Sequence, residues 1–273
     1  MLTKNNNISD LRILCIFAHP DDEGFGSGGT LATLADQKAH ITVVCATNGD
    51  VGEISDSSLA TKETLGTVRQ NELVASMNVT GIKDVRFLNY RDSGMSGSSD
   101  NLHPKALINA PQNDVRSRIS EIISELHPNI IITHDPTGGY GHPDHKSICE
   151  HTTNCHLTSS NECLLYYVCF PKSTFTKIWQ EFYRLGIKPP FASEDIESLG
   201  TPEEEVTTII DVSEYVDIKI SSLNCHRTQI DPKGPFEQLP KDMMRKIMSI
   251  EHYTLVSHSE YEKQDDILFN LVN

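Results

Sequence analysis

Residues 11–29, LRILCIFAHPDDEGFGSGG, join a continuous apolar run to a histidine, three adjacent acidic residues and a glycine-rich stretch. A short apolar run of this kind is typical of a strand that is buried on both faces of a parallel sheet. Asp21, Asp22 and Glu23 follow it directly. Three neighbouring carboxylates repel one another unless water or a cation compensates their charge. The rest of the sequence must indicate whether these carboxylates form a solvated loop tip or a cation site.

Strand and helix patterns alternate along the chain up to about residue 170. The strand patterns are short apolar runs, and they lie at 11–18, 40–48, 84–90, 129–135 and 162–171. Helical patterns lie between them, at 30–38, 67–81 and 114–128. The alternation predicts an α/β fold of the Rossmann-like, doubly wound kind, a three-layer sandwich around a mainly parallel sheet in the order 3-2-1-4-5. In that order the first and fourth strands are neighbours, and ligands bind beyond their carboxyl ends.

The C-terminal part of the chain is less regular. Residues 187–205 resemble an exposed acidic loop, and residues 206–229 predict a strand followed by a helix. No internal repeat or shift in composition marks a boundary. We therefore expect one domain over 1–273, with a motif-bearing core at about 11–170 and a variable part at about 171–273.

The composition argues against several classes of protein. The formal charge is 23 − 38 = −15 and no basic block interrupts it, so we expect no nucleic-acid partner. No stretch approaches the roughly 20 apolar residues of a membrane span, and the polar residues 1–10 do not resemble a secretory signal. Seven cysteines without a C-x-x-C pair favour buried thiols in a reducing compartment. We expect a cytoplasmic protein. The sequence leaves open whether the protein forms a homo-oligomer.

A second concentration of polar residues, HDPTGGYGHPDH at 134–145, follows the predicted fourth strand. It mirrors the first, because His142 and His145 have the same i, i+3 spacing as His19 and Asp22. If the two strands are neighbours, the two loops meet at one crevice. Two histidines and a carboxylate can fill three positions of a tetrahedral zinc site and leave the fourth for water. The sequence therefore predicts a cation site.

The glycine-rich stretch permits another interpretation. Gly24, Gly26 and Gly29 satisfy G-x-G-x-x-G, and Asp50 follows at roughly the 20-residue distance of a ribose acid, which is the pattern of a dinucleotide-binding Rossmann domain. However, five residues separate Ala18 from the first glycine, and the carboxylates between them would repel a pyrophosphate. Close packing of the turn and the helix start beside the metal explains the glycines better.

The pairing of AHPDDE (18–23) with GGYGHPDH (138–145) resembles the LmbE-like, PIG-L superfamily of zinc-dependent N-deacetylases. The likeness runs from about residue 11 to 155 and includes three further similar segments: TNGDVGE (47–53), VRQNEL (68–73) and YRDSGM (90–95). RDSGM and GGYGHPDH are similar in particular to the N-acetylglucosaminyl-inositol deacetylases and the related thiol-conjugate amidases.

The resemblance implies a metal-dependent hydrolase that removes the N-acetyl group from an N-acetylated amino sugar or glycoconjugate, a small-molecule substrate. It implies that His19, Asp22 and His145 hold one zinc ion per chain, with iron as the alternative metal. Asp21 would be the general base for the zinc-activated water. His142 would face the substrate, protonated, to stabilise the oxyanion and supply the leaving amine.

Two further motif residues have implied roles. Tyr140 would help to hold the carbonyl oxygen, and Asp144 would orient one of its two neighbours, His142 or His145, as carboxylates behind metal ligands do. An amidase that cleaves a larger acyl group from a thiol conjugate is the alternative activity. A non-catalytic sugar-binding domain is disfavoured by the intact Asp21, which metal binding alone would not need.

Weaker candidates lie in family-like segments near the expected crevice, where they could hydrogen-bond sugar hydroxyls: Glu53, Arg69, Asp92, His226 and Gln229. Arg69 could equally form a helical i, i+3 pair with Glu72. The other histidines are expected to be structural or surface residues, among them His103, His134 and His252.

Overall fold

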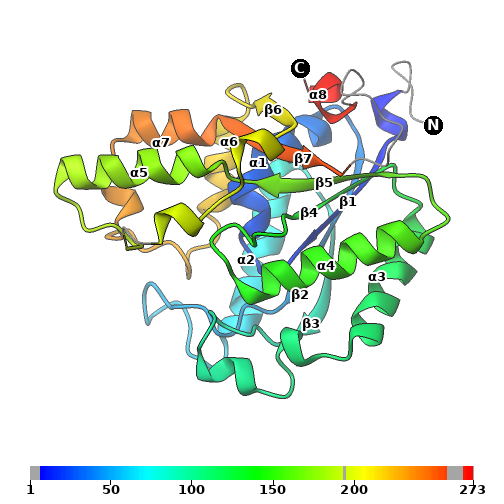
Figure 1. Cartoon of the computed structure of the whole chain (residues 1–273), viewed down its shortest axis with the longest axis horizontal. Helices are drawn as coiled ribbons and strands as arrows, with labels where there is room; N and C mark the ends of the chain where they lie inside the picture. Colours follow the sequence, from blue (N-terminus) through cyan, green and yellow to red (C-terminus); the bar gives the residue numbers. More distant parts are fainter. Residues whose placement is uncertain (1–6, 193–194, 257–266, 273) are drawn as a thin grey trace.

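The computed structural model describes residues 7–192, 195–256 and 267–272. Within these residues, seven strands form one sheet in the order β3-β2-β1-β4-β5-β7-β6 (Figure 1). The strands are β1 (Arg12–Phe17), β2 (His40–Thr47), β3 (Asp84–Tyr90), β4 (Ile130–His134), β5 (Leu164–Cys169), β6 (Thr208–Asp211) and β7 (Ile250–Leu255). The first five pair in parallel. The predicted order 3-2-1-4-5 is therefore confirmed.

Helices cover both faces of the sheet, as expected for a three-layer sandwich (Figure 1). They are α1 (Asp22–Asp36), α2 (Leu65–Thr80), α3 (Gln112–Leu126), α4 (Pro143–Thr158), α5 (Lys172–Leu185), α6 (Val216–Leu223), α7 (Lys241–Met248) and α8 (Ile267–Val272). Short 3₁₀ turns are η1 (Ile8–Asp10), η2 (Ser99–Leu102), η3 (Leu107–Asn109), η4 (Ile196–Ser198), η5 (Glu203–Glu205) and η6 (Phe236–Gln238).

Two apolar cores separate the layers. On one face of the sheet, α1 and α2 bury Leu34 and Met77 against the strands, and α6 packs on both helices. On the other face, α3 and α4 bury Ile119 and Ile148. Five of the cysteines are buried and all seven are free, as expected for small apolar side chains: Cys15, Cys45, Cys149, Cys155 and Cys169 are the buried ones. None of the described helices combines the length and apolarity needed to cross a membrane.

The C-terminal part of the chain extends the same sheet. The predicted strand and helix within 206–229 are confirmed as β6 and α6. β7 was not predicted; it pairs antiparallel with β5 on one side and with β6 on the other. The sheet is thus mixed, and its edge beyond β5 is built from residues after 200.

Helix α1 begins earlier than predicted. A helix was expected at 30–38, but α1 starts at Asp22 and contains the whole glycine-rich stretch. The reason is close packing: a Cβ on Gly24 would lie 2.5 Å from Leu223 Cδ2, and one on Gly26 would lie 2.1 Å from Val168 Cγ1. The glycines thus serve helix packing rather than a phosphate-binding turn, which removes the basis of the dinucleotide alternative.

The close approach of α1 to β5 predicts an unusual response to alanine. In a helix interior, glycine to alanine normally stabilises by up to ~1 kcal/mol, but Gly26→Ala should destabilise by about 1–3 kcal/mol because Val168 has no room to move. Gly28→Ala is the matched control, since its Cβ would meet Lys219 Cγ at 3.2 Å, and it should cost less. Urea unfolding measures both, and a Gly26→Ala protein as stable as the parent would contradict the packing argument.

Candidate active site

The two polar motifs meet because β1 and β4 are parallel neighbours, with Ile16 opposite Thr133. The turn after β1 carries His19, and the loop after β4 leads to His145 in the first turn of α4. His19 Nδ1 lies 3.2 Å from His145 Nε2. The predicted convergence of the two motifs is therefore what the structure shows.

Donor atoms of His19, Asp22 and His145 lie close to one another. One Asp22 oxygen lies 3.2 Å from His145 Nε2, and the other lies 3.4 Å from His19 Nδ1. In a tetrahedral site with metal–ligand bonds of about 2.0–2.1 Å, ligand atoms stand about 3.3 Å apart. The spacing and the donor chemistry of these three side chains thus fit a divalent ion such as zinc.

Hydrogen bonds fix the orientation of both imidazoles. His145 Nδ1 lies 3.1 Å from the carbonyl oxygen of Gly138, and His19 Nε2 lies 3.2 Å from Asp144 Oδ2. Each ring can donate its proton there and leave the other nitrogen as a lone-pair donor toward the cluster. We expected Asp144 to orient a neighbour within its own motif. It holds His19 across the crevice instead, because α4 directs its carboxylate toward β1.

The cluster that could hold a metal ion is larger than these three residues. Among the described residues, three overlapping groups could hold an ion: His19 with His142 and His145; His19 with Asp92, His142 and Asp144; and Asp22 with His134 and His145. His134, which we expected to be structural or on the surface, belongs to the third of these groups. Its Nε2 accepts the Ala18 N–H at 3.0 Å, and its ring stacks on His145. Its position at the end of the fourth strand, beside the second motif, was the feature of the sequence that could have indicated its place in the cluster.

Asp92 lies within the cluster, next to His19. Its side chain is buried, with Oδ1 3.6 Å from His19 Nε2 and bonded by the backbone N–H of Gly94 at 2.8 Å. Burial alone would raise its pKa, but His19 and the Gly94 hydrogen bond outweigh burial and hold the pKa well below the ordinary value. Asp92 is thus an anion beside His19, and the predicted sugar contact of Asp92 stays a prediction.

Asp21 lies beside the cluster and is held by Arg69. Arg69 Nη2 donates to Asp21 Oδ2 at 3.0 Å and to the carbonyl oxygen of Pro20 at 2.7 Å, and Nη1 donates to that of Gly49 at 2.8 Å. Burial raises the pKa of Asp21 to about 6, although Arg69 opposes the shift. Arg69 is buried, and Glu72, the alternative partner of Arg69, accepts the N–H of Thr228 at 2.8 Å instead. A sugar contact of Arg69 stays a prediction.

His142 belongs to two of the groups that could hold an ion, and the ring of Tyr140 lies beside it. The backbone N–H of Asp144 donates to His142 Nδ1 at 3.2 Å, which caps α4 and leaves that nitrogen without a proton. Burial and the neighbouring His19 and His145 lower the pKa of His142 to about 3. The protonated form that we expected is therefore not supported, and a neutral ring with a proton on Nε2 replaces it. The Tyr140 side chain is 48% exposed, with its ring 5.1 Å from that of His145.

The remaining sugar-contact candidates have different outcomes. His226 is 0% exposed and its Nε2 lies 2.8 Å from Glu23 Oε1, so it cannot touch a substrate and that prediction is wrong. Gln229 Nε2 donates to the backbone carbonyl of Glu53 at 3.0 Å. The Glu53 side chain is exposed, and its contact with a sugar stays a prediction. His103 and His252 lie outside the cluster, as expected.

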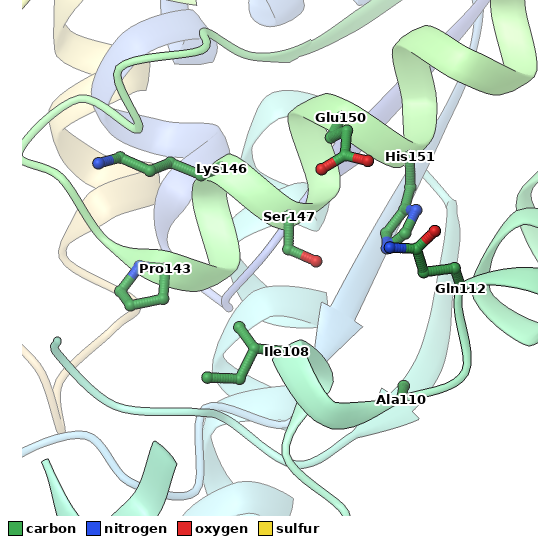
Figure 2. Close-up of a pocket in the computed structure, with 8 residues that line it drawn as sticks. All are labelled: Ile108, Ala110, Gln112, Pro143, Lys146, Ser147, Glu150 and His151. Carbon is green, nitrogen blue, oxygen red and sulfur yellow. The ribbon is translucent and has the colours of Figure 1, made fainter. Parts of the chain in front are cut away.

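A pocket of about 280 Å³ lies next to the cluster but contains none of its members. Figure 2 shows it between the start of α4 and the segment that joins η3 to α3, lined by Ile108, Ala110, Gln112, Pro143, Lys146, Ser147, Glu150 and His151. Pro143 follows His142 directly, so the pocket adjoins the cluster at the start of α4. The candidate active site is therefore defined by its chemistry rather than by this hollow.

Comparison with known proteins agrees with the geometry. The PIG-L family, described as GlcNAc-PI de-N-acetylase, matches residues 14–156. The 1D-myo-inositol 2-acetamido-2-deoxy-alpha-D-glucopyranoside deacetylase of Acidothermus cellulolyticus is 35% identical over 268 residues, which cover 93% of this chain and 91% of that protein. The deacetylase of the same name from Streptomyces griseus is 33% identical over 287 residues, 95% and 89% of the two chains.

A solved structure shares the fold. The N,N'-diacetylchitobiose deacetylase from Pyrococcus horikoshii superimposes with a TM-score of 0.62 at 23% identity, over 93% of this chain and 87% of that one. A doubly wound sheet with a His/Asp cluster beyond β1 and β4 places this chain in the class of α/β proteins with a cluster that could hold a metal ion. Within that class, this chain belongs to the PIG-L family of de-N-acetylases, as the resemblance of its motifs implied.

The backbone of Asp21 generates a stability prediction. Its φ is 125°, a conformation that costs a non-glycine residue about 1–3 kcal/mol. Asp21→Gly and Asp21→Ala both lose the carboxylate, but only glycine adopts this φ freely, so the glycine variant should be more stable by about 1 kcal/mol. Asp36, in the last turn of α1, is the control, where alanine should be the more stable choice. Chemical denaturation gives all four values, and equal stability of the two Asp21 variants would argue against strain.

The buried pair of His226 and Glu23 predicts a pH dependence of stability. Burial would lower the pKa of His226, but Glu23 outweighs it and raises the pKa above 6.5. The stability that this pair contributes is therefore fully present below about pH 6.5 and is lost as the pH rises through the folded-state pKa. The difference in unfolding free energy between the parent and His226→Gln should shrink from pH 6 to pH 9. His103→Gln should show no such trend, and a difference that grew with pH would refute the assignment.

Proposed function

We propose that this protein removes the acetyl group from the nitrogen of an N-acetylated amino sugar, with an N-acetylglucosaminyl inositol as the substrate class. Two observations support the proposal. The buried His/Asp cluster has the donor chemistry of a hydrolytic metal centre. The relatives that match nearly the whole chain carry names that describe this activity.

We assign His19, Asp22 and His145 as the ligands of one divalent ion, zinc or alternatively iron. The observation that carries this assignment is the closeness of their donor atoms. His19 Nδ1 lies 3.2 Å from His145 Nε2, and the two Asp22 oxygens lie 3.2 Å from His145 Nε2 and 3.4 Å from His19 Nδ1, respectively. A divalent ion at such a site supplies Lewis-acid polarisation of an amide carbonyl and a water nucleophile near neutral pH. The chain itself supplies the proton transfers and the orientation of the substrate.

Asp21 is the proposed general base. Arg69 holds one of its oxygens, which leaves the other free to accept a proton from the attacking water. A pKa of about 6 keeps the carboxylate mostly ionised at pH 7 yet close to the working pH, which is where proton transfer is most effective. The accepted proton then passes to the nitrogen of the leaving amino sugar as the amide C–N bond breaks, so that acetate and a free amine are the products.

His142 is the proposed hydrogen-bond donor to the carbonyl oxygen. With Nδ1 occupied by the Asp144 N–H, the neutral ring carries its proton on Nε2 and can direct it at the negative charge that develops during attack. Tyr140, exposed beside it, can add a second hydrogen bond from its hydroxyl. Neither role requires a positively charged histidine.

An amidase acting on a thiol conjugate with a larger acyl group is the alternative activity. A pocket built for an acetyl group admits a larger acyl group only by displacing packed atoms, so the two activities separate by acyl size. The cytoplasmic location and the oligomeric state expected from the sequence stay predictions.

The function is tested by acetate release and metal content on the same preparation. The parent should release acetate from an N-acetylglucosaminyl inositol faster than it releases bulky acids from N-acyl analogues, and it should carry about one divalent ion per chain. His145→Ala should lose both the ion and the activity. His103→Ala is the control and should lose neither. Asp21→Asn should keep the ion but lower kcat by roughly 10²–10⁴-fold.

Three outcomes would count against this proposal. Faster cleavage of bulky acyl-cysteinyl conjugates would favour the amidase. Full metal occupancy in His145→Ala would remove the ligand assignment. An Asp21→Asn protein that turned over at the parent rate with its ion in place would exclude Asp21 as the base.

A further inference from the structure

The backbone of Asp21 differs from every other strained position that the structure describes. Four non-glycine residues have a positive φ: Asp21 at 125°, Lys38 at 71°, Asn89 at 59° and His127 at 44°. The last three lie in or close to the left-handed helical region, which ordinary residues can enter. Asp21 lies far from it. Surrounding groups must therefore hold the peptide in place.

Glu23 provides that restraint. Its Oε2 accepts the backbone N–H of Asp21 at 2.9 Å. Its Oε1 lies 2.8 Å from His226 Nε2 and accepts the Ser76 hydroxyl at 2.8 Å. Ser76 in turn lies 2.6 Å from the Ser222 hydroxyl. Glu23 is only 1% exposed, so this carboxylate is fixed by three partners and faces away from solvent.

The glycines of α1 make this arrangement sterically possible. A Cβ on Gly24 would lie 2.5 Å from Leu223 Cδ2, so α6 can approach the first turn of α1 only because that position has no side chain. The chain leaves α6 at Leu223 and turns back through His226, whose N–H bonds the Leu223 carbonyl at 2.9 Å. The contact between α1 and α6 therefore delivers His226 to Glu23.

We propose that Glu23, anchored by His226, is a positioning residue that holds the strained peptide of Asp21 and so aims its carboxylate at the metal-binding cluster. The inference rests on the proposed role of Asp21. Arg69 holds the carboxylate of Asp21 at its far end, and Glu23 holds the backbone at the near end. With both ends fixed, the carboxylate of Asp21 stays where it can accept a proton from the attacking water.

The kinetic test uses two replacements of Glu23. Glu23→Met keeps the volume but removes both acceptors, and it should lower kcat about 10- to 100-fold with KM and metal content within about twofold. Glu23→Gln keeps an acceptor for the Asp21 N–H and should recover most of the rate. Ser222→Ala is the matched control, since it loosens the same buried network without touching Asp21, and its kcat should stay within about twofold.

A double-mutant cycle separates positioning from general loosening. In an Asp21→Asn background the base is already absent, so adding Glu23→Met should cost less than about threefold. A loss as large as in the parent would show that Glu23 does not act through Asp21 and would overturn the proposal. If Glu23→Met does not fold, His226→Asn replaces it, with an expected loss of three- to tenfold that again disappears in the Asp21→Asn background.

A second measurement does not depend on activity. Amide hydrogen exchange of the Asp21 N–H should be at least tenfold faster in Glu23→Met than in the parent, and unchanged in Ser222→Ala. Unchanged exchange in Glu23→Met would overturn the proposal even if the parent is an active deacetylase. Faster exchange in Glu23→Met together with a parent that releases no acetate would instead retain the restraint and reject the proposed function.

Discussion

The parallel pairing of β1 with β4 is the constraint on which the candidate site depends. Their residues match in register from Ile13 opposite Ile130 to Ile16 opposite Thr133, so both strands end at the same level of the sheet. His19 follows one strand and His134 ends the other, and they therefore lie close together despite the 115 positions between them in sequence. A slip of one residue would turn alternate side chains to the opposite face, and the donor atoms would no longer converge.

The same geometry explains how three adjacent carboxylates can be tolerated in one short segment. Each is compensated by a different partner: Asp22 by the histidines of the cluster, Asp21 by Arg69, and Glu23 by His226. The strained peptide at Asp21 and the start of α1 send the three side chains in separate directions. The acidic run is therefore three separate sites of charge pairing rather than one cation cage, and of the three residues only Asp22 belongs to a group that could hold a metal ion.

Local patterns were sufficient to predict the first five strands, their order and the convergence of His19, Asp22 and His145. Apolar runs and i, i+3 spacing are properties of neighbouring residues, so they can be read without the fold. The partners of Arg69 and His226 could not be read in this way, because each is set by a helix that packs from elsewhere in the chain. The early start of α1 was missed for a related reason: glycine disfavours an isolated helix, and only contact with α6 and β5 makes it favourable here.

The strand β7 has a consequence for how the chain can be divided. The family match ends at residue 156, yet β5, which follows it, is a run of apolar residues whose outer side is paired with β7. Without residues after 200, β5 would present unpaired backbone N–H and C=O groups along an apolar border, and such a border recruits strands from other molecules. A shortened chain that kept both metal-binding motifs would therefore tend to aggregate. Changes of sequence in the C-terminal part are therefore tolerable only while that part still covers the border.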